Sequence, residues 1–90
     1  MKKLFVIVDA FLDRSQQTVQ AAHAVGEFYK CCPKEAAAWG NENIIIKKAK
    51  NLEPWVDDCD TTFREPYWEN KVTAIAAYRE EGFAKELPFV

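Results

Sequence analysis

The hydrophobic positions near the start of the chain form one uninterrupted run, from Leu4 to Val8. A continuous run of this kind is typical of a strand buried on both faces of its sheet. Ser15 is a candidate N-cap, because its hydroxyl can accept a hydrogen bond from an unpaired first-turn N–H. From Gln16 to about Tyr29, apolar and small residues recur at helical spacing, which predicts a helix packed closely on the sheet.

The remaining two thirds of the chain divide into shorter segments. Pro33 suits the first turn of a second, short helix over Lys34 to Trp39, which Gly40 would end. Pro54 and Trp55 allow at most one helical turn. The other predicted segments are strands at Ile44–Ala49, Thr61–Arg64 and Lys71–Ala77, a loop at Glu65–Asn70 and a short helix at Arg79–Glu86.

The order of these segments predicts the fold. A strand, two helices and a second strand imply a crossover connection and parallel pairing. The last two strands are close enough in sequence to pair antiparallel. We therefore expect an α/β fold: a single small domain over residues 1–90, with a mixed four-stranded β-sheet flanked by helices in the order β-α-α-β-β-β-α.

Composition and charge narrow the classes of function. Twelve Lys and Arg against fourteen Asp and Glu give a net charge of −2, which excludes a globally basic nucleic-acid binder but leaves room for a local basic patch. Three cysteines without a CxxC pair and a single histidine argue against a zinc site and favour a reducing cytosol. The first apolar run stops at Asp9, too early for a signal peptide, and no run approaches the ~20 residues of a membrane span. We expect a cytoplasmic protein without a metal.

Polar residues at the start of the first helix are the clearest candidates for chemistry. Gln16, Gln20 and His23 follow a buried strand, and sites in open α/β sheets lie at the carboxyl ends of strands. The N-terminal turn of a helix offers free N–H groups and a partial positive charge, which favour a bound anion, and Arg14 adds a full charge. On spacing alone a packed histidine is the more frequent case, and the two glutamines are equally compatible with a solvated stripe.

Three other groups admit a functional or a structural interpretation. Paired carboxylates can perform acid–base chemistry, although an acidic loop is usually solvated. Lysines at a strand end can contact phosphates or protect the edge of a sheet. Aromatic side chains can stack on bases, although core packing is more frequent. The residues concerned are Asp57, Asp58 and Asp60 with Thr61, Thr62, Arg64 and Glu65; Lys47, Lys48 and Lys50; and Trp39, Trp55, Tyr67 and Trp68.

Several segments together resemble a known family. They are Lys3–Val8, the helix Gln16–Ala24 (Gln-Gln-Thr-Val-Gln-Ala-Ala-His-Ala), Trp39–Ile46, Phe63–Pro66, Thr73–Ala76 and Leu87–Pro88. Their content and order, over nearly the whole chain, are similar to the archaeal/eukaryotic-type peptidyl-tRNA hydrolase family, and more narrowly to its short bacterial and phage branch. The helix motif is fairly specific, and the shorter segments gain weight from their order.

The resemblance implies both a fold and an activity. It implies a mixed four-stranded sheet flanked by helices. It also implies hydrolysis of the ester that joins a peptide to the 3′-terminal ribose of tRNA, with tRNA as partner and no metal or organic cofactor. Gln20 and His23 fall on the glutamine and histidine of the motif, whereas Gln16 stands where the main enzymes carry a catalytic lysine. Asp9 stands in place of an arginine, and Tyr67 in place of an aspartate usual in the branch.

The expected site follows from this resemblance together with the residues. The catalytic candidates are His23, Gln20, Asp60 and Thr62, in which His23 or Asp60 would activate water while Gln20 and Thr62 hold the carbonyl oxygen. The substrate-binding candidates are Arg14, Gln16, Lys47, Lys48 and Arg64. The alternatives are a non-catalytic tRNA- or nucleotide-binding module and a dimeric interaction module. Three Trp and six Phe in so short a chain would favour a homodimer that covers an apolar face.

Overall fold

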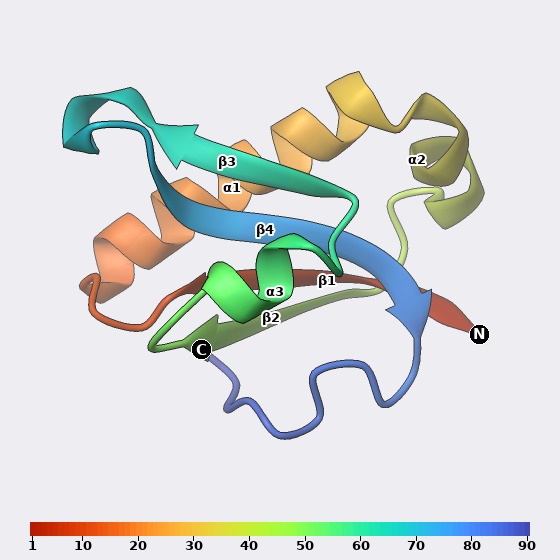
Figure 1. Cartoon of the computed structure of the whole chain (residues 1–90). Helices are drawn as coiled ribbons and strands as arrows, with labels where there is room; N and C mark the ends of the chain where they lie inside the picture. Colours follow the sequence, from red (N-terminus) through yellow and green to blue (C-terminus); the bar gives the residue numbers. More distant parts are fainter.

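A four-stranded sheet with the strand order β2-β1-β4-β3 forms the centre of the molecule (Figure 1). The computed structural model describes residues 1–90. β1 (Lys2–Asp9) pairs in parallel with β2 (Ile44–Ala49) and antiparallel with β4 (Lys71–Glu80). β3 (Thr61–Glu65) pairs antiparallel with the outer side of β4. The predicted α/β class and mixed four-stranded sheet are confirmed.

The two faces of the sheet are covered differently. α1 (Arg14–Cys31) and α2 (Pro33–Trp39) cover one face, where Leu4, Val6 and Val8 of β1 pack against Phe28 in the larger core cluster. α3 (Glu53–Val56) and the segment 81–90 cover the other, where Ile7 belongs to a smaller cluster. Figure 1 shows α1 behind the sheet and α3 in front of it. The uninterrupted apolar run of β1 therefore reflects burial on both sides.

The ends of the helices agree with the sequence except at one N-cap. α1 begins two residues earlier than expected, because Asp13, not Ser15, is its N-cap: Asp13 Oδ1 accepts from the backbone N–H of Gln16 at 2.8 Å. A carboxylate at this position also opposes the positive end of the helix dipole. α2 begins at Pro33 and ends at Gly40, whose φ of 62° is the left-handed value expected after a helix.

The predicted helix over Arg79–Glu86 is wrong. Arg79 and Glu80 extend β4, where they pair with Lys3 and Lys2 of β1, so that their backbone groups are satisfied by the sheet. Residues 81–87 form turns, and Gly82 takes a φ of 95° that no helix can use. Beyond these turns, the N–H of Val90 donates to the Ile46 carbonyl at 3.1 Å. The end of the chain therefore covers the outer edge of β2.

Candidate functional site

One edge of the sheet gathers the features that place sites in α/β proteins. β3 and β1 are both antiparallel to β4, so β1, β2 and β3 all point the same way and their carboxyl ends share an edge. α1 begins at this edge, and the turn between β3 and β4 lies there too (Figure 1). Free helix N–H groups and strand ends therefore meet at the place where the sequence predicts a site.

A buried hydrogen-bond network lies beneath this edge. Gln20 of α1 is only 1% exposed, and its side-chain oxygen accepts from the hydroxyl of Thr73 at 2.7 Å. Thr73 reaches the helix because β4 has one extra residue there: Phe63 pairs with Ala74, but Arg64 pairs with Val72. This β-bulge turns Thr73 towards α1, whereas Val72 joins the apolar cluster on the other face.

Glu65 completes the network at the end of β3. Its Oε2 accepts from Gln20 Nε2 at 3.0 Å, and its Oε1 accepts from the backbone N–H of Tyr67 at 3.3 Å. Tyr67 belongs to the 3-10 turn η1 (Pro66–Trp68), which Glu65 caps. Because both oxygens of this buried carboxylate have donors, Glu65 connects α1 to the turn that follows β3.

The network unites three of the segments on which the family resemblance rests. Gln20 comes from the helix motif, Glu65 from the segment Phe63–Pro66, and Thr73 from the segment Thr73–Ala76. Glu65 and Thr73 were not predicted as members of one site. The sequence feature that could have indicated them is their position inside the two short segments of the resemblance. A glutamate or a threonine at these positions does not by itself indicate burial.

His23 lies one helical turn beyond Gln20, on the surface. Its ring stacks on Phe63 of β3 with 4.4 Å between ring centroids and 10° between ring planes. Gln20 contacts Glu65, and His23, one turn later, contacts Phe63, so α1 runs antiparallel to β3. Helix residues one turn apart therefore contact strand residues two positions apart, which lie on the same face of the sheet. The structure thus places His23 beside the network, with its imidazole exposed to solvent.

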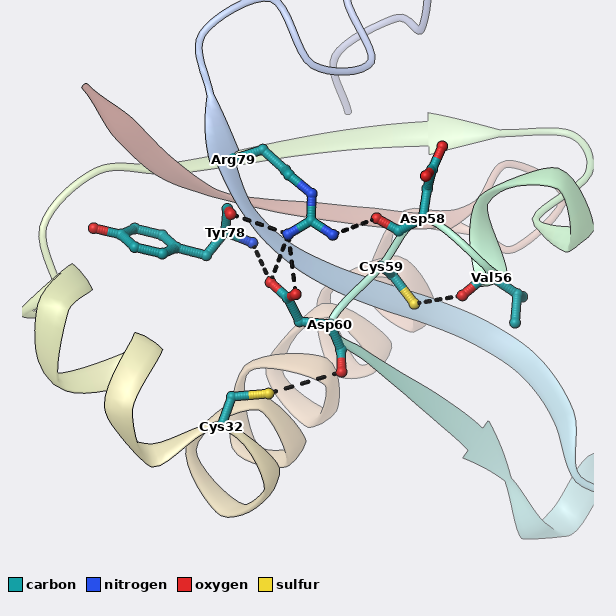
Figure 2. A network of polar contacts seen from close by, with 7 residues as sticks. All are labelled: Cys32, Val56, Asp58, Cys59, Asp60, Tyr78 and Arg79. Atoms are coloured by element: carbon teal, nitrogen blue, oxygen red, sulfur yellow. Dashed lines mark hydrogen bonds and ion pairs between the residues drawn. The ribbon is translucent and has the colours of Figure 1, made fainter.

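Asp60 lies at the opposite end of β3 and makes no contact with His23. Its carboxylate accepts from the backbone N–H of Tyr78 at 2.7 Å and forms an ion pair with Arg79 at 2.9 Å (Figure 2). Asp60 precedes Phe63, the residue under His23, by three strand residues, or about 10 Å of extended chain. The expected pairing of Asp60 with His23 is therefore not found, because Asp60 completes the end of the sheet.

Thr62 is on the wrong face of the sheet for the predicted oxyanion role. It pairs with Ile75, which belongs to the apolar cluster on the α3 side. Side chains alternate along a strand, so Phe63 and Glu65 face α1 while Thr62 faces away from it. The structure therefore brings His23 and Gln20 together and leaves out Asp60 and Thr62.

Two of the five predicted substrate-binding side chains lie at the start of α1. Arg14 is its exposed first residue, and Gln16 has a half-buried side chain without a hydrogen bond of its own. Arg64 of β3 is also exposed, and its guanidinium donates to the Asn70 carbonyl at 3.3 Å across the turn. All three therefore stand near the carboxyl edge of the sheet.

The two predicted lysines of β2 differ from each other. Lys47 is buried, and its ammonium donates to the carbonyls of Ala84 and Leu87 at 3.2 and 3.1 Å, which leaves it no role with a substrate. Lys48 and Lys50 line an open hollow of about 500 Å³ at the carboxyl edge, together with Ala10 and Pro88. The prediction for Lys47 is wrong because the turns after β4 cover that lysine.

A further cation stands at this edge without having been predicted. Lys71, opposite Glu65 in the sheet register, places its ammonium 3.0 Å from Oδ2 of the buried Asp9. Asp9 Oδ1 also accepts from the backbone N–H of Phe11 at 2.8 Å. Asp9 therefore holds a mostly exposed lysine at the end of β1, where the resemblance implies an arginine.

The thiols of Cys32 and Cys59 do not fit a nucleophilic role. Burial raises the pKa of Cys32, and the negative charge of Asp60 adds to the effect. Burial likewise raises the pKa of Cys59, again with a contribution from Asp60. A raised pKa lowers the thiolate fraction, so both groups stay protonated near neutral pH.

The remaining surface contains an apolar groove and no further chemical centre. The groove has a volume of about 240 Å³ and lies between α1 and β2, where Ala22, Val25 and Ile44 line it. The expected homodimer stays a prediction. No group of three His, Cys, Asp or Glu side chains converges on a point, and no helix has the length and apolarity to cross a membrane.

No protein-family model, curated protein or solved structure matches the chain.

Proposed function

We propose that the protein hydrolyses the ester between a peptide and the 3′-terminal ribose of tRNA, in the cytoplasm, at the surface above Gln20. The observation that carries this proposal is the convergence of Gln20, Glu65 and Thr73. Three separate segments of the chain, each resembling a part of peptidyl-tRNA hydrolases, meet in one buried network. Glu65 and Thr73 lie 45 and 53 positions from Gln20 in the chain, and their meeting in the fold supports the interpretation of the three segments as parts of one site.

In this proposal His23 is the catalytic residue. Its exposed imidazole accepts a proton from water as the water oxygen adds to the ester carbonyl carbon. The bond from this carbon to the ribose oxygen then breaks, and the ribose oxygen takes up a proton. The stack on Phe63 holds the ring in one plane. Gln20 is buried and its amide is bonded to Thr73 and Glu65, so it is a positioning residue that fixes α1 against β3.

The cations at the carboxyl edge suit the charge of the substrate. Arg14 offers a full positive charge to a phosphate at the start of α1, where the Asp13 carboxylate already caps the helix. Lys48 and Lys50 line the neighbouring hollow. The ammonium of Lys71, from β4, lies beside Asp9 at the end of β1. These groups form a local basic edge on a chain of net charge −2, which is sufficient for RNA contacts at low salt.

Hydrolysis of a purified peptidyl-tRNA tests the proposal. His23→Ala should lower kcat about 100- to 10,000-fold, the contribution of a general base. The matched control is Lys30→Ala, an exposed residue in the last turn of the same helix. Circular dichroism of both variants checks the fold. Turnover of His23→Ala within a few-fold of wild type would show that the imidazole is not the base.

The second candidate is a non-catalytic tRNA-binding module. The observation in its favour is that Asp60 and Thr62 lie apart from His23. Of the four catalytic candidates, His23 is then the one titratable side chain exposed beside the network. This candidate predicts no turnover by the wild-type protein, with tRNA binding that weakens steeply as salt is added.

A further inference from the structure

The turn between β3 and β4 presents two aromatic side chains to solvent. Tyr67 is 92% exposed and Trp68 is 38% exposed. The other two aromatic residues considered for base stacking are used inside the fold: Trp39 is 3% exposed, and Trp55 packs edge-on against Phe83. A tyrosine ring exposed to this degree contributes almost nothing to the core, so its place at the tip needs another explanation.

The backbone of this turn is held in one conformation. The N–H of Tyr67 donates to Glu65 Oε1, and the N–H of Asn70 donates to the Glu65 carbonyl at 3.0 Å. Glu69 and Asn70 then take left-handed φ values of 54° and 59°, which close the turn. An aromatic ring on a fixed backbone loses little freedom when a ligand covers it, so the turn is preorganised for contact.

The turn carries cations on both sides of its aromatic tip. Arg64 precedes it and has no carboxylate partner, and Lys71, whose mostly exposed side chain pairs with Asp9, follows it. Glu69 is the single exposed carboxylate between them, because Glu65 is buried. Aromatic rings flanked by cations are the pattern with which proteins hold single-stranded nucleic acid, since bases stack on the rings and phosphates meet the charges.

We propose that Tyr67, with Trp68 beside it, is a stacking platform for an unpaired nucleobase at the single-stranded end of an RNA. The inference rests on the proposed function in that the ligand is taken to be RNA. The same Glu65 carboxylate bonds to Gln20 and to the N–H of Tyr67, so one side chain fixes the platform and the network relative to each other. A base inside a duplex is stacked on both faces and would not be accessible to the ring.

Binding of a 5′-labelled single-stranded RNA hexamer, followed by fluorescence anisotropy at low salt, tests the platform. Tyr67→Ala should weaken binding about 5- to 150-fold, the range for loss of one base–aromatic stack. Tyr67→Phe keeps the ring and should bind within about twofold of wild type. Tyr29→Ala is the matched control, because it removes a half-exposed aromatic ring at the far end of α1. A blunt duplex of the same sequence should be insensitive to Tyr67→Ala.

A hexamer series with one abasic nucleotide at successive positions identifies the stacked base. When the abasic nucleotide replaces the stacked base, wild type and Tyr67→Ala should bind the hexamer with equal affinity, since the stack is already missing. Equal binding of the intact hexamer by wild type and Tyr67→Ala would overturn the proposal. Failure of the wild-type protein to bind the hexamer would also overturn it.

Peptidyl-tRNA hydrolysis by the same variants separates this inference from the proposed function. Binding that depends on Tyr67 without turnover supports the platform and contradicts the hydrolase. Turnover with RNA binding that is unaffected by Tyr67→Ala contradicts the platform and leaves the hydrolase standing.

Discussion

The contact between α1 and β3 has a polar group at each end, and the two groups differ in what they join. At the carboxyl end of β3, Gln20, Glu65 and Thr73 form the Gln20 network, which is buried and links side chains 45 and 53 residues apart. At the amino end, Asp60 and Arg79 form the Asp60 tie, which is half-buried and satisfies backbone groups of neighbouring strands.

The difference separates two carboxylates that look alike in the sequence. The Asp60 backbone N–H donates to the Ala76 carbonyl, and its side chain then accepts from Tyr78, so Asp60 continues the β3–β4 ladder by one more bond. Glu65 instead connects a helix to a turn. An acidic residue thus extends the strand ladder at one end of β3 and connects a helix to a turn at the other.

Gln20→Ala should have the largest effect on stability. It leaves the Glu65 carboxylate and the Thr73 hydroxyl without a buried partner, at a cost of about 3 kcal/mol in the free energy of unfolding. In a domain of this size the Tm should fall by roughly 10–20 °C. Gln16→Ala is the control, because this glutamine lies on the same helix outside the network, and its Tm should stay within a few degrees. A small change for Gln20→Ala would mean that the network is not structural.

Glu65→Gln should have an intermediate effect. The amide can accept from only one of the two N–H donors, Gln20 Nε2 or the backbone of Tyr67, so one bond is lost at about 1–2 kcal/mol. Chemical denaturation measures this loss. Hydrogen exchange at the Tyr67 and Asn70 amides should also accelerate, because the turn loses its cap. Unchanged hydrogen exchange at these two amides would mean that the conformation of the turn does not depend on the network.

Asp60→Asn should cost less, about 1 kcal/mol. The variant keeps an oxygen for the Tyr78 N–H and loses the partly exposed ion pair with Arg79. The difference from wild type in the free energy of unfolding should shrink as salt is added, since salt screens the charge pair. Peptidyl-tRNA hydrolysis should be unaffected. A large loss of turnover would return Asp60 to the candidate site.

Thiol alkylation should show the smallest effect, because the cysteines should differ only in the rate at which they are alkylated. Cys31 is exposed and should react first, whereas burial raises the pKa values of Cys32 and Cys59 and so lowers their thiolate fractions. Below its pKa, each buried thiol should react on the order of tenfold faster per unit rise in pH. Mass spectrometry of peptides after brief iodoacetamide treatment measures the rates. Asp60→Asn should speed the labelling of Cys32, because the negative charge of Asp60 contributes to the raised pKa of this thiol.

Much of the fold could be predicted because the deciding signals are local. The run Leu4–Val8 indicates burial on both faces, and Pro33 and Gly40 mark the ends of α2. The expected helix over Arg79–Glu86 failed because its first residues pair with Lys3 and Lys2, at the other end of the chain. Lys47 was misjudged for the same reason, since its burial depends on Ala84 and Leu87.

The candidate site was predictable only in part. Gln20 and His23 share one helix motif, so their neighbourhood follows from helical spacing. That Gln20 is buried and His23 exposed depends on where β3 lies, which no local pattern tells. Asp60 is a catalytic candidate in the sequence, but the residue that decides its role is Arg79, which lies 19 positions away in the chain. Glu65 belongs to the acidic group in the sequence but is not among the catalytic candidates, because its partners are Gln20 and a backbone N–H that only the fold brings near.

The extra residue in β4 also has a consequence for insertions and deletions. Removal of Val72 or Thr73 would restore an unbroken two-residue period between Lys71 and Ala74. Because Ala74 faces α1, the one residue left opposite Arg64 would face the apolar cluster on the other side of the sheet, and no side chain of this part of β4 would reach Gln20. A one-residue gap at this point of β4 would therefore mark a chain that has kept the sheet and lost the threonine bond to Gln20.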